Sequence, residues 1–220
     1  DEGFNTFINS LADDDFNNGE YKEAPTNMEG VVPFLFGPSS EAIMLTPDAM
    51  KERNIGVALY FKPGLGLALL RKEILGPDRF DYAFREYIRR WAYKHPTPWD
   101  FFRTMDNVAG EDLHWFWKAW FLENYKFDQA IASVTYENND AKNGAIVSIV
   151  NMEQGALPIY ISYETKSGVK GTIKLPVEVW NNTNNWKVKL PTTEELQRVT
   201  LDEEKVFPDM NYGNNSWKSN

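Results

Sequence analysis

The spacing of hydrophobic residues changes near residue 127, and this change limits the folds open to the chain. Before it, apolar residues recur at helical intervals, as in the segment 4–11. Beyond it they alternate with polar residues, as in the segment 159–163, and a period of two is that of a β-strand. The sequence therefore predicts an α+β chain of two domains, helical over residues 1–126 and β over residues 127–220.

Turn and cap signals divide the first part into helices. The pair Gly76-Pro77 ends one helical run, and His95-Pro96 ends the next. A hydroxyl cap at Thr97, followed by proline and then by Asp100, predicts a new helix that Gly110 closes. A last helix is expected over residues 113–121. The segment 13–40 is rich in Asn, Gly, Pro and acids and predicts an irregular connection, with a short helix from Glu41.

The second part predicts an antiparallel, immunoglobulin-like β-sandwich. Six or seven short alternating runs fill it, and turn signals at Asn143-Gly144 and Ser167-Gly168 separate them. The tail over residues 212–220 is polar and rich in Asn, but Trp217 predicts that part of it docks on the domain.

Composition excludes several classes of partner. The chain has 32 acidic and 23 basic residues, a net charge of -9, which would repel a phosphate backbone, so we expect no nucleic acid partner. No apolar run is long enough to cross a bilayer, so no membrane-spanning segment is expected. The absence of Cys removes disulfides and thiolate ligands. The compartment stays open between a bacterial cytoplasm and a periplasm.

Only two histidines are present, too few for a complete three-ligand zinc site of the usual kind. His95 stands at a helix end and is interpreted as a capping or surface residue. His114 stands beside Trp115 in the last helix and is interpreted as a packing or solvent-facing residue.

Glu2 is the candidate metal ligand. In the first turn of a helix an acid also favours the helix dipole, so its position alone has a purely structural interpretation. The segment Asp1-Glu2-Gly3-Phe4-Asn5-Thr6-Phe7, however, resembles the part of M1-family (gluzincin) aminopeptidases that follows H-E-x-x-H and supplies the third zinc ligand. This resemblance implies that Glu2 is that ligand.

Tyr60 is the candidate catalytic residue. Residues 60–64, Tyr-Phe-Lys-Pro-Gly, resemble the Tyr-x-Lys-Gly segment of the same family with one residue inserted. In that family the tyrosine donates its hydroxyl to the oxyanion of the tetrahedral intermediate, a task that suits a phenol because it is neutral and a good donor. Without the family context, Tyr60 could equally be a core tyrosine beside a helix start.

The resemblance extends over the helices that begin at His95 and Gly110, which match structural elements of the family, and over the β-sandwich that follows. It implies an enzyme that hydrolyses N-terminal peptide bonds of peptide substrates through a zinc-bound water. The sequence contains no H-E-x-x-H. We therefore expect a C-terminal piece that begins inside its own active site, depends on upstream domains of the same chain, is inactive alone and carries no bound Zn2+.

Two other interpretations remain. The chain could belong to a non-catalytic protein that keeps a peptidase scaffold and uses the β-sandwich to recognise peptides or glycans, since fold alone does not exclude this. The β-sandwich could also serve only as a brace for the catalytic domain.

Overall fold

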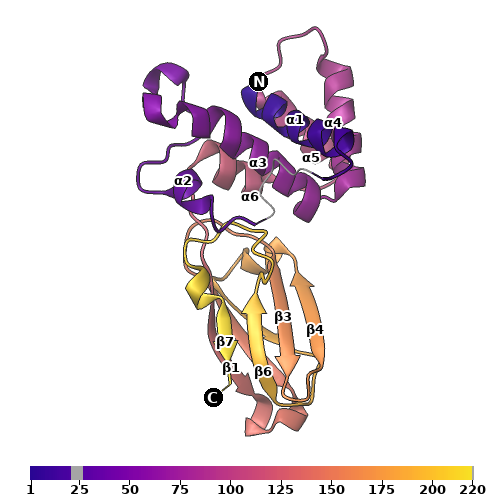
Figure 1. Cartoon of the computed structure of the whole chain (residues 1–220), viewed down its shortest axis with the longest axis vertical. Helices are drawn as coiled ribbons and strands as arrows, with labels where there is room; N and C mark the ends of the chain where they lie inside the picture. Colours follow the sequence, from indigo (N-terminus) through magenta and orange to yellow (C-terminus); the bar gives the residue numbers. More distant parts are fainter. Residues whose placement is uncertain (21–26, 220) are drawn as a thin grey trace. The chain divides into compact units, whose positions relative to one another are not determined.

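The computed structural model of the chain describes residues 1–20 and 27–219. It contains helices and two antiparallel sheets, so the predicted α+β architecture is confirmed (Figure 1). Internal contacts divide the described residues into two units: a helical unit of residues 1–20 with Phe34–Asn124, and a β unit of Asn27–Pro33 with residues 125–219. The domain boundary that the sequence predicts after residue 126 is not tested by this division and stays a prediction.

The helical elements succeed one another along the first part of the chain. They are α1 (Glu2–Phe16), α2 (Val32–Phe36), η1 (Pro47–Ala49), η2 (Glu52–Asn54), η3 (Gly56–Phe61), α3 (Lys62–Leu69), η4 (Leu70–Ile74), α4 (Pro77–Trp91), α5 (Pro98–Ala109), α6 (His114–Phe116) and η5 (Trp117–Leu122).

The expected irregular connection over residues 13–40 is wrong in part. Helix α1 continues to Phe16, and α2 occupies Val32–Phe36. No helix begins at Glu41, where the chain forms turns before η1. The short apolar run of α2 ends on the fully buried Phe36, whose ring meets Trp120, so tertiary packing selects a helix that local composition did not indicate. Residues 21–26 of this predicted segment lie outside the described residues.

A continuous helical segment runs from Gly56 to Ile74 and ends just before Gly76-Pro77, the predicted stop. Pro63 lies in the first turn of α3, where its missing N–H costs no helical hydrogen bond. On either side of α3 the turns η3 and η4 are π-helical, and each π turn accommodates an extra residue in a helix.

Local signals correctly predicted the start of α4 and both ends of α5, whereas α4 ends at Trp91, before the predicted break at His95-Pro96. Gly76 has a left-handed φ of 79° before α4, and Gly110 has φ 66° after α5. At the start of α5, Thr97 and Asp100 form the reciprocal capping box, in which the Thr97 N–H donates to Asp100 Oδ2 at 2.8 Å.

The β unit contains the seven strands β1 (Gln129–Tyr136), β2 (Ala145–Asn151), β3 (Ile159–Thr165), β4 (Lys170–Leu175), β5 (Asn185–Lys189), β6 (Leu196–Leu201) and β7 (Ser216–Lys218). One sheet has the order β1-β2-β5 and the other β4-β3-β6-β7, with every pair antiparallel. Val147 and Ile149 of the first sheet and Val199 of the second are fully buried, so the core lies between the inner faces of two sheets.

The predicted turns and tail of the β unit are confirmed. Gly144 and Gly168, with φ of 103° and 89°, stand in the connections β1–β2 and β3–β4. Trp217 lies on β7 and pairs with Val199 of β6, so the tail adds an edge strand to the second sheet.

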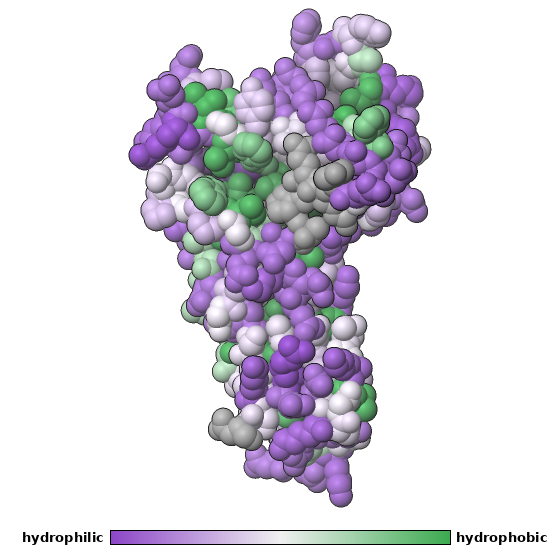
Figure 2. Space-filling model, in the orientation of Figure 1, coloured by the Kyte–Doolittle hydropathy of each residue, from purple (hydrophilic) through white to green (hydrophobic). Residues whose placement is uncertain are grey.

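Patches of hydrophobic residues are visible on the helical unit, whereas hydrophilic residues dominate the visible face of the β unit (Figure 2). Most of the large exposed hydrophobic side chains likewise belong to the helical unit. Within the described part of the chain, no helix combines the length and apolarity needed to span a bilayer.

Candidate functional site

Aromatic packing of Phe4 and Phe7 orients helix α1 and thereby positions Glu2 in its first turn. Phe7 is buried, and its ring lies 5.3 Å from that of Phe80. The ring of Phe4 lies 4.9 Å from that of Phe101. These edge-to-face contacts fix the rotation of α1 about its axis. Glu2, in the first turn, is left partly exposed at the edge of the helical unit.

Two glycines let α1 approach the segment that carries Tyr60. A Cβ atom on Gly3 would lie 2.6 Å from Cβ and Cγ of Pro63, and a Cβ atom on Gly64 would lie 2.9 Å from Cγ2 of Thr6. A larger side chain at either position would force the helices apart, because such short carbon contacts do not occur. The Glu2 segment and the Tyr60 segment are therefore neighbours in the fold, although Gly3 and Tyr60 are 57 positions apart in the sequence.

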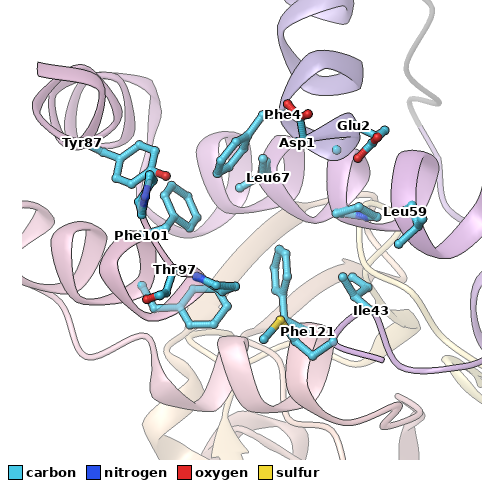
Figure 3. Close-up of a pocket in the computed structure, with 16 residues that line it drawn as sticks. Asp1, Glu2, Phe4, Ile43, Leu59, Leu67, Tyr87, Thr97, Phe101 and Phe121 are labelled. Atoms are coloured by element: carbon cyan, nitrogen blue, oxygen red, sulfur yellow. The ribbon is translucent and has the colours of Figure 1, made fainter. Parts of the chain in front are cut away.

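A cavity of about 400 Å³ opens beside Glu2 within the helical unit (Figure 3). Its charged lining residues are Asp1 and Glu2. Aromatic and apolar side chains form most of the remaining lining: Phe4, Ile43, Met44, Leu59, Pro63, Leu67, Tyr87, Pro96, Pro98, Phe101, Phe102 and Phe121. Glu2 lies beside Leu59, with Tyr87 at the opposite end. An apolar hollow with carboxylates at one end suits a ligand that combines an apolar group with a cation.

Tyr60 lies next to this cavity in sequence but does not line it. It belongs to the π turn η3, and its side chain is 43% exposed. Its chain neighbours Leu59 and Pro63 contribute to the cavity wall. The structure thus brings the backbone segments of Glu2 and Tyr60 together and leaves the Tyr60 side chain on a more exposed surface.

Neither histidine lines the cavity. Both side chains are exposed, His95 between α4 and α5 and His114 at the start of α6. Over residues 1–20 and 27–219, no group of three or more His, Cys, Asp or Glu side chains is arranged to hold a metal. Within the described chain, the donors beside the cavity are the carboxylates of Asp1 and Glu2, which fit part of a zinc ligand set.

The sequence interpretation assigned the helices after His95 a structural role, yet several of their residues line the cavity. Thr97, the cap of α5, is one, and Phe101 follows one turn later on the same face. Tyr87 of α4, the helix before His95, lines the cavity as well, and burial, followed by the charge of Asp100, raises the pKa of its hydroxyl. The helical spacing of Thr97 and Phe101 could have placed them on one face, but only the fold shows which partner that face meets.

No protein-family model matches the sequence, and no curated protein matches it. The fold is similar to that of Legionella pneumophila aminopeptidase A, solved in complex with aspartic acid, with a TM-score of 0.67 over 94% of this chain. The two sequences are 14% identical, and the match spans 23% of the Legionella chain. This likeness establishes an aminopeptidase-like fold and leaves activity to be argued from the site.

Proposed function

We propose that this chain is part of a zinc-dependent aminopeptidase that hydrolyses N-terminal peptide bonds. One observation carries the proposal: the candidate ligand Glu2 stands at the charged end of an otherwise mainly apolar cavity. The similarity of the fold to an aminopeptidase supports it. The resemblance of residues 1–7 and 60–64 to the M1 family supports zinc ligation by Glu2 and hydrogen-bond donation by Tyr60 as the chemistry of the site.

Glu2 would hold the metal through its carboxylate, a ligand type that zinc accepts in catalytic sites. The aromatic contacts of Phe4 and Phe7 fix α1, so the carboxylate would be presented from a rigid helix rather than a loop. When bound, zinc polarises the scissile carbonyl and lowers the pKa of water.

Tyr60 would donate its hydroxyl hydrogen to the oxyanion that develops on the scissile carbonyl. Its exposure leaves the hydroxyl accessible to a substrate, and the Gly3–Pro63 contact ties its segment to the Glu2 helix. A neutral donor aimed at developing negative charge stabilises the transition state without binding the metal.

The described residues do not supply the rest of a zinc ligand set. The other ligands and the general base would come from a segment upstream of Asp1 in a longer protein, as the family resemblance implies. The 220-residue chain alone is expected to be inactive on peptides and to bind zinc weakly.

The test uses the full-length protein, assayed for zinc content and for turnover of aminoacyl amides. We expect Glu2→Gln to lose metal and activity together. Tyr60→Phe should keep the metal and lose turnover by roughly a hundredfold, the usual effect of removing one oxyanion donor.

Matched controls are Glu52→Gln, at the start of the 3₁₀ turn η2, and Tyr82→Phe, another exposed tyrosine. Both should keep wild-type zinc and turnover. If Glu2→Gln and Tyr60→Phe instead behave like these controls, the assignment is wrong. A parent sequence without an H-E-x-x-H motif about twenty residues before Glu2 would favour the non-catalytic binding protein.

A further inference from the structure

Lys62, the first residue of α3, buries an amine that the proposed chemistry does not use. Its side chain is 1% exposed, whereas lysines are almost never fully buried unless they are paired with an anion. The Nζ atom of Lys62 instead meets an amide oxygen and an aromatic ring. Burial accordingly lowers the pKa of Lys62 to about 7.

The buried amine is part of a chain of hydrogen bonds across the helical unit. Lys62 Nζ donates to Asn124 Oδ1 at 2.6 Å and lies 4.6 Å from the centre of the Phe36 ring. The Asn124 Nδ2 group in turn donates to the carbonyl oxygen and the hydroxyl of Ser40, at 3.0 and 2.8 Å. Asn124 therefore links the start of α3 to the loop that begins at Ser40.

The main chain of Lys62 is held as firmly as its side chain. Trp120 Nε1 donates to the Lys62 carbonyl at 2.8 Å in a fully buried hydrogen bond. A Cβ atom on Gly66 would lie 2.4 Å from the same indole nitrogen, so the indole rests directly on the α3 backbone. Trp120 thus holds the main chain of Lys62, and Asn124 holds its side chain.

This anchor lies on the opposite side of the helical segment from Tyr60. Residues two apart on a helix point about 200° away from each other, and Lys62 is buried while Tyr60 is 43% exposed. The anchored side chain therefore sets the direction in which the Tyr60 side chain leaves the helix. On the other side of the bridge, the loop after Ser40 brings Ile43 and Met44 to the cavity wall.

We propose that Lys62 and Asn124 form a positioning pair that fixes the orientation of Tyr60 relative to the cavity wall at Ile43 and Met44. This inference rests on the proposed function, because it gives the pair its role through Tyr60. A buried amine without an anion opposes folding, whereas an apolar side chain of similar length would not. A residue that lowers stability, as a buried lysine does, is expected at positions where function requires it.

The test is a comparison of Lys62→Met in two backgrounds of the full-length, zinc-loaded enzyme. In the wild-type background we expect kcat to fall by roughly tenfold, as small misplacements of a catalytic group do, with KM changed less than twofold. In the Tyr60→Phe background Lys62→Met should have no further effect, because the group it positions is already gone. Asn124→Leu should behave like Lys62→Met in both backgrounds and carries the test if Lys62→Met fails to fold.

A second readout does not depend on activity. In the metal-free 220-residue chain, Lys62→Met should accelerate amide hydrogen exchange together in residues 40–44 and 56–61. The matched control is Lys72→Met, which removes an exposed lysine of the same helical segment. It should leave turnover and exchange as in the wild type.

Two outcomes overturn the inference alone. One is a Lys62→Met enzyme with unchanged kcat while Tyr60→Phe is impaired. The other is an equal loss from Lys62→Met in both backgrounds, which would mean a general structural effect. If Tyr60→Phe itself leaves turnover unchanged, the proposed role of Tyr60 fails and the positioning pair fails with it.

Discussion

Gly3 of α1 lies against the ring of Pro63 in α3, so close that a Cβ on the glycine would stand 2.6 Å from two ring carbons. The contact joins residues sixty positions apart, each next to a candidate functional residue or one turn from it. The close approach of these helices therefore holds the segments of Glu2 and Tyr60 together, in addition to packing the core.

Gly3→Ala should destabilise the helical unit by about 1–3 kcal/mol, the usual range for overpacking, because neither the rigid proline ring nor the helix backbone can move aside cheaply. Urea denaturation measures the change. Gly56→Ala is the control, since among the described residues no atom outside its chain neighbours and its own helix backbone lies within 4 Å of its added Cβ, and alanine favours a helix. Equal free energies of unfolding for the two variants would mean that a methyl group fits between Gly3 and Pro63.

Trp120→Phe should cost about 0.5–1.5 kcal/mol from the hydrogen bond alone, because it removes the indole N–H that donates to the buried Lys62 carbonyl. The lost indole volume adds a cavity term to this cost. Trp186→Phe, at a half-exposed tryptophan of β5, should change the free energy of unfolding much less. A Trp120→Phe chain as stable as the Trp186→Phe chain would contradict the structure at this point.

Features that depend on a few adjacent residues could be predicted from the sequence. The capping box of Thr97 and Asp100 and the left-handed turn at Gly110 are local, and so is the alternation that defines β3. The M1-family resemblance singled out Glu2 and Tyr60, and the structure places their segments side by side. It could not show that the Tyr60 side chain lies outside the cavity, because that depends on the turn geometry of η3.

What escaped prediction depends on distant partners. Lys62 stands in an apolar run before Leu67, which is an unusual place for a lysine. Its buried amine, however, depends on Asn124, 62 residues away in the sequence. Likewise, the segment Asn27–Pro33 belongs to the β unit because the Met28 N–H donates to the Lys205 carbonyl at 2.8 Å. No local pattern in residues 27–33 indicates a partner so far along the chain.

Asp209→Asn should destabilise the β unit by about 1–3 kcal/mol. The buried carboxylate accepts hydrogen bonds from the N–H groups of Gln129 and Asn211 and from Asn215 Nδ2, and an amide cannot accept all three. Asp140→Asn is the matched control, because this exposed side chain accepts from the Lys142 N–H alone and asparagine can replace it. Thermal unfolding of both variants measures the difference, and equal melting temperatures would refute the expectation.

Lys62→Met should change how stability depends on pH. Burial lowers the folded-state pKa of Lys62 from 10.5 to about 7, so between these values the unfolded chain binds the proton and the folded chain does not. The free energy of unfolding contributed by Lys62 therefore rises with pH across this window, by up to about 1.4 kcal/mol per pH unit, and is smallest below pH 7. Methionine does not titrate. The free energy of unfolding of the variant, relative to that of the wild type, should therefore be highest near pH 6 and fall steadily toward pH 10.

Urea denaturation of both chains at a series of pH values measures this change, and subtracting one curve from the other cancels the groups that they share. Lys72→Met, at an exposed lysine, should run parallel to the wild type throughout. If the Lys62→Met curve also runs parallel between pH 7 and 10, the amine has an ordinary pKa in the folded chain. Its environment would then have to be far more hydrated than a 1% exposed side chain allows.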